Sequence, residues 1–184
     1  MSPILGIWAS QNYSRYSLPT SFESIATANG TGSAATITFS SIPSTFTHLQ
    51  LRYVAKSTGS ASYLIVTFNG NTTNYDGHYL GGNGTSASAG RNGATNQMEF
   101  YNGVANTTTS VAAAGIIDIL DYTNTSKYRT VRGLTGVDYN GSGGLYLGSG
   151  LFMSTTAVST IGLTLNTGNF TTDTSFALYG IKGA

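Results

Sequence analysis

The sequence has no cysteine, only three prolines and very little charge. Without cysteine the chain can form neither a disulfide framework nor a thiolate metal site. Asp, Glu, Lys and Arg make up 8% of the 184 residues and the formal net charge is +1, whereas ordinary soluble proteins contain roughly 25% charged residues. The eight basic residues are scattered from Arg15 to Lys182 and cannot neutralise many phosphates, so we expect no nucleic-acid partner.

Long hydrophobic runs are also missing. The longest apolar stretch, residues 111–120, is interrupted by Gly115 and Asp118, and it is far shorter than the roughly 20 residues that a membrane-spanning helix needs. No basic segment precedes the apolar residues near the N-terminus, so a secretory signal is not expected. We therefore predict a protein that does not enter membranes and stays where it is made until it is assembled.

The residues that are abundant favour a folded, all-β protein. Apolar residues make up 40% of the chain, with 12 Tyr and 8 Phe, which argues against intrinsic disorder. Thr, Val, Ile, Tyr and Phe are plentiful, whereas the charged and polar helix formers are scarce. The length is sufficient for one domain with a single core, and too short for two ordinary domains.

Alternation of side chains supports the β assignment. In residues 47–55, Leu49, Leu51 and Tyr53 alternate with polar neighbours, which is the period of a half-buried strand. Asn-Gly pairs, which readily adopt positive φ, begin at positions 29, 69, 92, 102 and 140. Strands are predicted at residues 22–27, 35–39, 47–55, 63–68, 96–101, 111–122, 127–137, 144–153, 159–165 and 175–181. About ten short strands separated by such turns predict an antiparallel β-sandwich of jelly-roll type, with a barrel as the alternative.

Two segments depart from this pattern. Residues 81–94 are rich in Gly, Ser and Asn and are predicted to form a long exposed loop. Residues 1–20 contain the single tryptophan and precede the first alternating strand, so we expect an extended N-terminal arm ahead of one domain at 21–184. The arm either packs on its own core or binds a neighbouring subunit. In the second case its interface residues are Ile4, Leu5, Ile7 and Trp8, with the tryptophan as a large buried anchor.

Groups that could perform catalysis are few. Asp118 and Asp121 are close in sequence, but a spacing of three places them on opposite faces of a strand, so we expect ion pairs with Lys127, Arg129 or Arg132 rather than a carboxylate pair. His48 lies on the polar face of its strand. His78 lies near Asp76, yet the chain contains no GxSxG, HExxH or Walker A motif. We predict no catalytic residue and no enzymatic activity.

The best candidate for a metal site is a partial calcium-loop pattern. Asp138, Asn140, Ser142 and Gly143 match the front of such a loop, but Ser149 occupies the position of the closing acidic residue. A tight hairpin turn at Asn140 explains the same residues. We therefore predict neither a metal nor a cofactor.

Carbohydrate binding is the main alternative among functions. Exposed tyrosine rings can stack on sugar faces, and Tyr75, Tyr79 and Tyr101 lie beside Gly- and Asn-rich segments. The other interpretation is that these tyrosines line the two sheets with their hydroxyls at the rim.

Several phrases of the chain resemble small virion proteins of tailed bacteriophages. They span nearly the whole sequence: ILGIWASQ, SFESIAT, SSIPSTFTHLQLRYVA followed by FNG, IIDILDYTNTSKYRTVRGLTGVD followed by NGSG, and FALYGIKG. The resemblance implies a compact β-sandwich, often trimeric, on the outside of the particle. None of the phrases contains a catalytic motif, so no functional residue can be transferred.

The expected function is that of a non-enzymatic virion component, assembled in the cytoplasm of the bacterial host. The resemblance implies a protein that either decorates the capsid or is built into a tail appendage. We expect a capsid decoration or cement protein that forms a homotrimer and contacts the major capsid protein or other virion proteins. The alternative is a tail-fibre or receptor-binding module that recognises host surface glycans.

Overall fold

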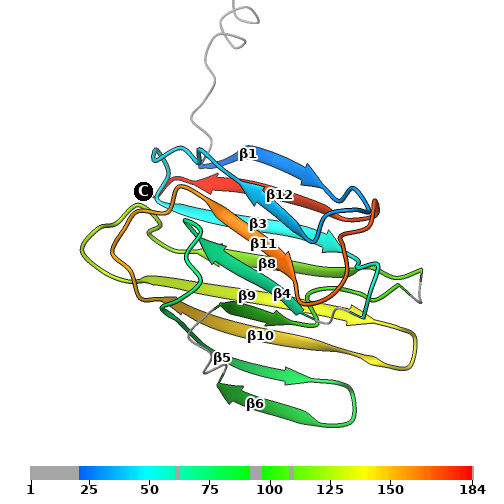
Figure 1. Cartoon of the computed structure of the whole chain (residues 1–184). Coiled ribbons are helices and arrows are strands. Elements are labelled where there is room, and N and C mark those ends of the chain that lie inside the picture. The colour runs from blue at the N-terminus through cyan, green and yellow to red at the C-terminus, as the bar shows by residue number, and fades with distance from the viewer. Residues whose placement is uncertain (1–20, 61–62, 92–96, 108–109, 184) are drawn as a thin grey trace, which may run out of the picture.

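The protein is a sandwich of two antiparallel β-sheets (Figure 1). The structure, a computed structural model, describes residues 21–60, 63–91, 97–107 and 110–183. The larger sheet has eight strands, in the spatial order β1 (Phe22–Asn29), β12 (Ser175–Ile181), β3 (His48–Ala55), β8 (Ala113–Ile119), β9 (Arg129–Asp138), β10 (Gly143–Phe152), β5 (Tyr75–Gly82) and β6 (Ala87–Arg91). The smaller sheet has four strands, in the order β2 (Thr36–Phe39), β11 (Ile161–Leu165), β4 (Tyr63–Phe68) and β7 (Met98–Tyr101).

Consecutive strands mostly alternate between the two sheets. β1 lies in the larger sheet, β2 in the smaller, β3 in the larger and β4 in the smaller, and the chain later crosses again from β7 to β8, from β10 to β11 and from β11 to β12. Two hairpins, β5–β6 and β9–β10, stay in the larger sheet and extend it beyond β8. Figure 1 shows this extension as the lower part of the molecule.

The core lies between the facing sides of the two sheets. The side chains predicted to point inward from β3, including Leu49 and Leu51, are fully buried, as are Ile161 and Leu163 of β11. Aromatic rings fill the space between the sheets, and the Phe68 and Phe152 centroids lie 5.5 Å apart. The sandwich predicted from the alternating residues is therefore confirmed.

Glycine lets aromatic rings lie directly against the larger sheet. A Cβ atom on Gly115 of β8 would lie 2.5 Å from the Tyr53 ring, and a Cβ on Gly133 of β9 would collide with the Phe100 ring. Any larger side chain at these positions would require the ring to move, because protein cores are close-packed. These two glycines therefore set the close contact between rings and sheet.

The predicted turns also form at several Asn-Gly pairs. Asn69 and Gly70 both have positive φ, at 53° and 69°, and so do Asn140 and Gly141, at 60° and 112°. These values match the requirement of tight hairpin turns. The pair at position 29 has no positive φ, and the pair at 92 lies outside the described residues.

The prediction of a long loop at residues 81–94 was wrong. Gly81 and Gly82 end β5, and Ala87–Arg91 form β6, which pairs with β5 at the edge of the sheet. The small side chains gave no alternating pattern, but backbone hydrogen bonds to β5 are sufficient to add an edge strand.

The arm predicted at residues 1–20, with Ile4, Leu5, Ile7 and Trp8, lies outside the described residues. Across the described ranges, no helix is long and apolar enough to cross a membrane.

Candidate interaction surface

A row of four aliphatic side chains crosses the outer face of the larger sheet, on the side away from the core. Ile116 of β8 pairs in register with Leu134 of β9, Leu134 with Leu147 of β10, and Leu147 with Leu80 of β5. Their exposed fractions are 41%, 47%, 54% and 56% in that order. We call these four residues the aliphatic ridge. Because soluble proteins rarely expose large side chains of this kind side by side, the ridge is a candidate interaction surface.

A second row, parallel to the ridge, is built mainly from small residues. Ala114 of β8 pairs with Gly136 of β9, which pairs with Leu145 of β10, which pairs with Gly82 of β5. Apart from Leu145, these residues leave a depression beside the ridge, which we call the trough. The trough belongs to an open groove of about 1120 Å³ that is lined also by Ile116 and Leu134 of the ridge and by residues of the β5–β6 and β9–β10 turns.

Paired charges border the ridge on its other side. Asp118 and Arg132 are register partners whose charged atoms lie 4.0 Å apart, and Arg91 contacts Asp76 at 2.6 Å. The hydrogen bond from Arg91 lowers the pKa of the Asp76 carboxyl. An apolar centre with a neutral polar border is the composition of a protein–protein interface.

The opposite end of the same face is closed by its own side chains. The Phe22 and Tyr179 rings stack with centroids 4.7 Å apart, and the Arg52 guanidinium lies 5.1 Å from the Phe22 centroid. The Nε of Arg52 also donates to the Gln50 side-chain oxygen at 2.8 Å. The outer face is thus covered by its own aromatic rings over β1 and β12, and it is open from β3 to β6.

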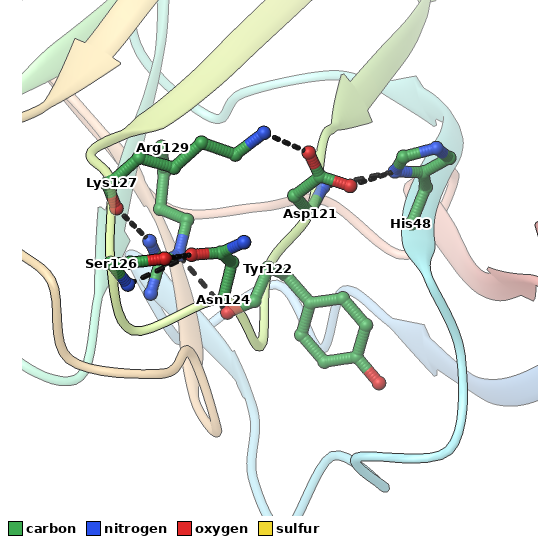
Figure 2. Close-up of polar contacts among 7 residues, drawn as sticks. All are labelled: His48, Asp121, Tyr122, Asn124, Ser126, Lys127 and Arg129. Atoms are coloured by element: carbon green, nitrogen blue, oxygen red, sulfur yellow. Dashed lines mark hydrogen bonds and ion pairs between the residues drawn. The ribbon is translucent and has the colours of Figure 1, made fainter.

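The loop between β8 and β9 holds a polar network near the edge of the sandwich (Figure 2). Lys127 donates to the Asp121 carboxylate, and this hydrogen bond lowers the pKa of Asp121. The backbone N–H of Asp121 donates to Nδ1 of His48 at 2.9 Å, which joins the loop to the start of β3. Asn124 accepts from the backbone N–H and the hydroxyl of Ser126, both at 2.8 Å. These contacts order the loop.

Arg129 anchors the same loop from inside. Its side chain is fully buried, and its guanidinium donates to four backbone carbonyls: Tyr122 at 3.1 Å, Lys127, Thr155 at 3.2 Å and Thr156 at 3.0 Å. Burial lowers the pKa of Arg129. The group binds protein backbone on all sides, which defines a structural role.

The structure does not bring the candidate catalytic residues together. Asp118 lies on the outer face of β8, whereas Asp121 lies in the following loop with positive φ, at 49°. Of the cations predicted as their partners, Arg132 contacts Asp118 and Lys127 contacts Asp121, whereas Arg129 binds carbonyls. Asp76 contacts Arg91 rather than orienting His78.

The partial calcium-loop sequence forms the β9–β10 turn. The Asp138 carboxylate accepts from the Asn140 N–H at 2.8 Å, and the Tyr139 N–H donates to the Ser142 carbonyl at 2.8 Å. Among the described residues, no group of three or more His, Cys, Asp or Glu side chains could hold a metal ion.

The three predicted glycan-contacting tyrosines have different surroundings. Tyr75 is 1% exposed, and its hydroxyl accepts from the Phe68 N–H at 2.8 Å and donates to the Asn71 carbonyl at 3.2 Å, so it belongs to the core. Tyr79 and Tyr101 are partly exposed, and their ring centroids lie 5.0 Å apart. This places Tyr75 out of reach of a sugar.

Two further tyrosines complete a cluster around Tyr101. The Tyr146 centroid lies 5.9 Å and the Tyr63 centroid 5.6 Å from that of Tyr101. Burial, followed by the nearby Glu99 carboxylate, raises the pKa of Tyr101. We call Tyr63, Tyr79, Tyr101 and Tyr146 the tyrosine cluster. It lies where β7, at the edge of the smaller sheet, meets β5 and β10 of the larger sheet.

Sequence reasoning missed the aliphatic ridge. Its signal was present, because Leu134 and Ile116 occupy positions whose strand neighbours on the same face are polar or small. Comparisons with known proteins add no family: no protein-family model matches the chain, and no curated protein matches it.

Proposed function

We propose that the protein is a non-enzymatic structural component of a bacteriophage virion. Its most specific form is a capsid decoration or cement protein that assembles from several copies of itself and stabilises contacts between capsid subunits. The trimer is the assembly that the sequence resemblance implies. In this proposal the protein is assembled in the bacterial cytoplasm and ends in the virion.

The open half of the outer sheet face carries this proposal. Six of the eight large hydrophobic side chains that are exposed among the described residues lie there: Val54, Leu80, Ile116, Leu134, Leu145 and Leu147. A structural protein works through extended contacts of this kind, and the neutral border makes such contacts tolerant of changes in salt.

The state of the carboxylates supports a role without catalysis. Five of the seven acidic side chains lie within 4.0 Å of a lysine or arginine: Glu23, Asp76, Asp118, Asp121 and Asp173. A cation beside a carboxylate favours its ionised form, whereas a general acid needs a raised pKa. These five acidic residues are therefore arranged as ion pairs.

The connectivity supports the jelly-roll type expected from the sequence. When the β5–β6 and β9–β10 hairpins are set aside, the remaining strands number one to eight along the chain. Their spatial orders become 1-8-3-6 in the larger sheet and 2-7-4-5 in the smaller. This is the arrangement of two Greek keys wrapped into facing sheets. Such a scaffold can bind other proteins through its outer faces and needs no ligand-binding site between its sheets.

Locating the protein in a particle tests the proposal. Labelling of intact virions, together with the copy number per virion, should give hundreds of copies on the head. A few to tens of copies on a tail appendage would favour the alternative below, and complete absence from virions would overturn both.

The predicted arm provides a binding test. Purified protein should bind empty capsids, and Trp8→Ala should weaken that binding while the circular dichroism spectrum stays unchanged. Tyr128→Ala is the matched control, because Tyr128 is an aromatic residue that is 51% exposed and lies in the loop before β9, away from the ridge. Undiminished capsid binding by Trp8→Ala would remove the arm from the proposal.

The tyrosine cluster favours a second candidate function, recognition of host surface glycans by a tail-fibre or receptor-binding module. Partly exposed rings beside one another offer apolar faces on which sugars stack. The isolated protein should then adsorb to host cells, and surface polysaccharide should compete. Tyr79→Ala should abolish adsorption, whereas Tyr128→Ala should not. If neither the wild type nor the Tyr128→Ala control adsorbs to host cells, this function is rejected.

A further inference from the structure

We propose that the open outer face binds the same face of a second copy of this chain through a two-fold contact. The proposal rests on self-assembly as part of the proposed function, and it adds the surface, the symmetry and the residues. Its basis is that the ridge and the trough are complementary to each other.

The complementarity is clearest along β9. Its outward-facing residues run from Arg132 through Leu134 and Gly136 to Asp138, which is a base, a large apolar residue, a glycine and an acid. Consider two copies whose larger sheets face each other. A two-fold axis lies midway between these two sheets, perpendicular to the strands and level with Thr135. This axis places Leu134 of each copy opposite Gly136 of the other. The same axis places Arg132 opposite Asp138, so that size and charge match together.

Two other strands repeat the match in size. The same axis sets Ile116 of β8 opposite Ala114 of the second copy, and Leu80 of β5 opposite Gly82. On β10 the partners are Leu145 and Leu147, so two exposed leucines face each other and this strand does not repeat the match in size. A face that carries a ridge next to its own trough is self-complementary, which is the requirement for a two-fold interface.

The charges at the contact favour a second copy over a charged partner. Asp118 and Arg132 compensate each other at 4.0 Å within one copy, so that the border carries no net charge. Arg132 is 61% exposed and Asp138 is exposed, so that both can reach across the interface. Two copies therefore meet without repulsion.

The size of the face is sufficient for a modest interface. Five strand spacings from β3 to β6 span about 24 Å, and the six residue spacings from Arg132 to Asp138 span about 20 Å. Two such faces cover roughly 1000 Å², which is the lower limit for a specific protein–protein interface. Twisted sheets that pack face to face keep their strands within about 30° of alignment, which is compatible with the two-fold axis.

Mass measurement with matched variants tests the contact. Light scattering over a range of concentrations should give a dimer or a higher even-numbered oligomer for the wild type. Leu134→Arg places two arginines in the troughs and should raise the dissociation constant at least roughly 100-fold. Thr130→Arg is the control, because Thr130 is exposed on the same face of the same strand but lies outside the ridge and trough. Its mass should equal that of the wild type.

Cross-linking tests the symmetry without a disruptive change, and the natural chain contributes no thiol because it has no cysteine. In the two-fold contact, the two copies of residue 134 lie about 7 Å apart along the strand direction, whereas those of residue 130 lie about 34 Å apart. A short bismaleimide should therefore cross-link Leu134→Cys into covalent dimers. Thr130→Cys should remain without a cross-link and run as a monomer under denaturing conditions. Equal yields from the two variants, or none from Leu134→Cys, would overturn the contact.

The other outcomes separate this inference from the proposed function. A trimer whose mass Leu134→Arg does not change would overturn the two-fold contact and leave the proposed trimer in place. A monomer that still binds capsids would overturn the contact but not the role in the virion. A monomer that binds no capsid would overturn both.

Discussion

Two neighbouring isoleucines on β8 show how differently the two faces of the larger sheet are used. Ile117 points into the sandwich and is fully buried, whereas Ile116 points outward and is 41% exposed. On β9 the same contrast separates Val131, fully buried, from Leu134, 47% exposed. The chain covers the inner face with its own second sheet and leaves the outer apolar row without cover from any described residue.

The difference teaches that alternation shows which residues share a face, but not whether that face is covered. Burial of apolar area stabilises by roughly 25 cal/mol per Å². The inner side chains contribute this free energy to folding. The four ridge side chains remain 41% to 56% exposed, so about half of this free energy is not used in folding. Substitutions on the two faces should therefore affect different equilibria, and three comparisons test this, followed by one ion pair outside the sheet.

The largest difference is expected between Ile117→Ala and Ile116→Ala. The first leaves a cavity in the core and should lower the free energy of unfolding by about 3 kcal/mol. The second should change it by less than about 0.5 kcal/mol. Urea denaturation at low protein concentration measures both. Equal losses at low concentration would contradict the contrast, whereas a loss for Ile116→Ala that appears only at high concentration would show that the outer face is buried in an oligomer.

Two arginines on β9 provide the second comparison. Arg129→Met removes the donors for four backbone carbonyls and should lower the free energy of unfolding by about 2–3 kcal/mol. Arg132→Met removes an exposed ion pair and should cost less than about 1 kcal/mol. Thermal unfolding followed by circular dichroism distinguishes them. If Arg129→Met lowers the free energy of unfolding no more than Arg132→Met does, the four backbone carbonyls find other hydrogen-bond donors.

Glycines on opposite faces give the third comparison. In Gly133→Ala the new methyl group meets the Phe100 ring, and the strain should destabilise the fold by about 1–3 kcal/mol. In Gly82→Ala the nearest atom is the Ser86 carbonyl oxygen at 3.6 Å, which is ordinary contact, so the change should be close to zero. Chemical denaturation checks both. A neutral Gly133→Ala would show that Phe100 can move at little cost.

The smallest effect concerns the ion pair in the β8–β9 loop. The hydrogen bond from Lys127 lowers the folded-state pKa of Asp121 below its ordinary value of 3.8. Its contribution to stability is therefore present above pH 4 and is lost as the pH falls through the folded-state pKa. Both side chains are partly exposed, so the contribution should be under about 1 kcal/mol. Asp121→Asn should flatten the stability profile between about pH 4 and pH 2, and an unchanged profile would contradict this assignment.

Much of the sandwich could be predicted from the sequence, because alternation is a local property. The bounds of β4 and β12 agree with the prediction residue by residue, and Leu49 and Leu51 face the core as expected. The β5–β6 hairpin was missed because Ala, Ser and Gly carry no alternation. Its pairing depends on β10, a strand more than fifty residues away.

The candidate surface was harder to predict, because it depends on register between strands. Leu80, Ile116 and Leu134 are each a single apolar residue on an otherwise polar or small face of its strand, whereas Leu147 shares its face of β10 with Leu145. Only the pairing of four strands places them in one row.

The hairpins that extend the larger sheet have a consequence for how such a surface can arise in evolution. Both β5–β6 and β9–β10 lie in the sequence between strands of the remaining sandwich, and together they supply Leu80, Leu134 and Leu147, three of the four ridge residues. A change confined to these two hairpins would therefore alter most of the ridge. The other eight strands would keep their connectivity, so the outer surface can vary in evolution without a change of the sandwich that supports it.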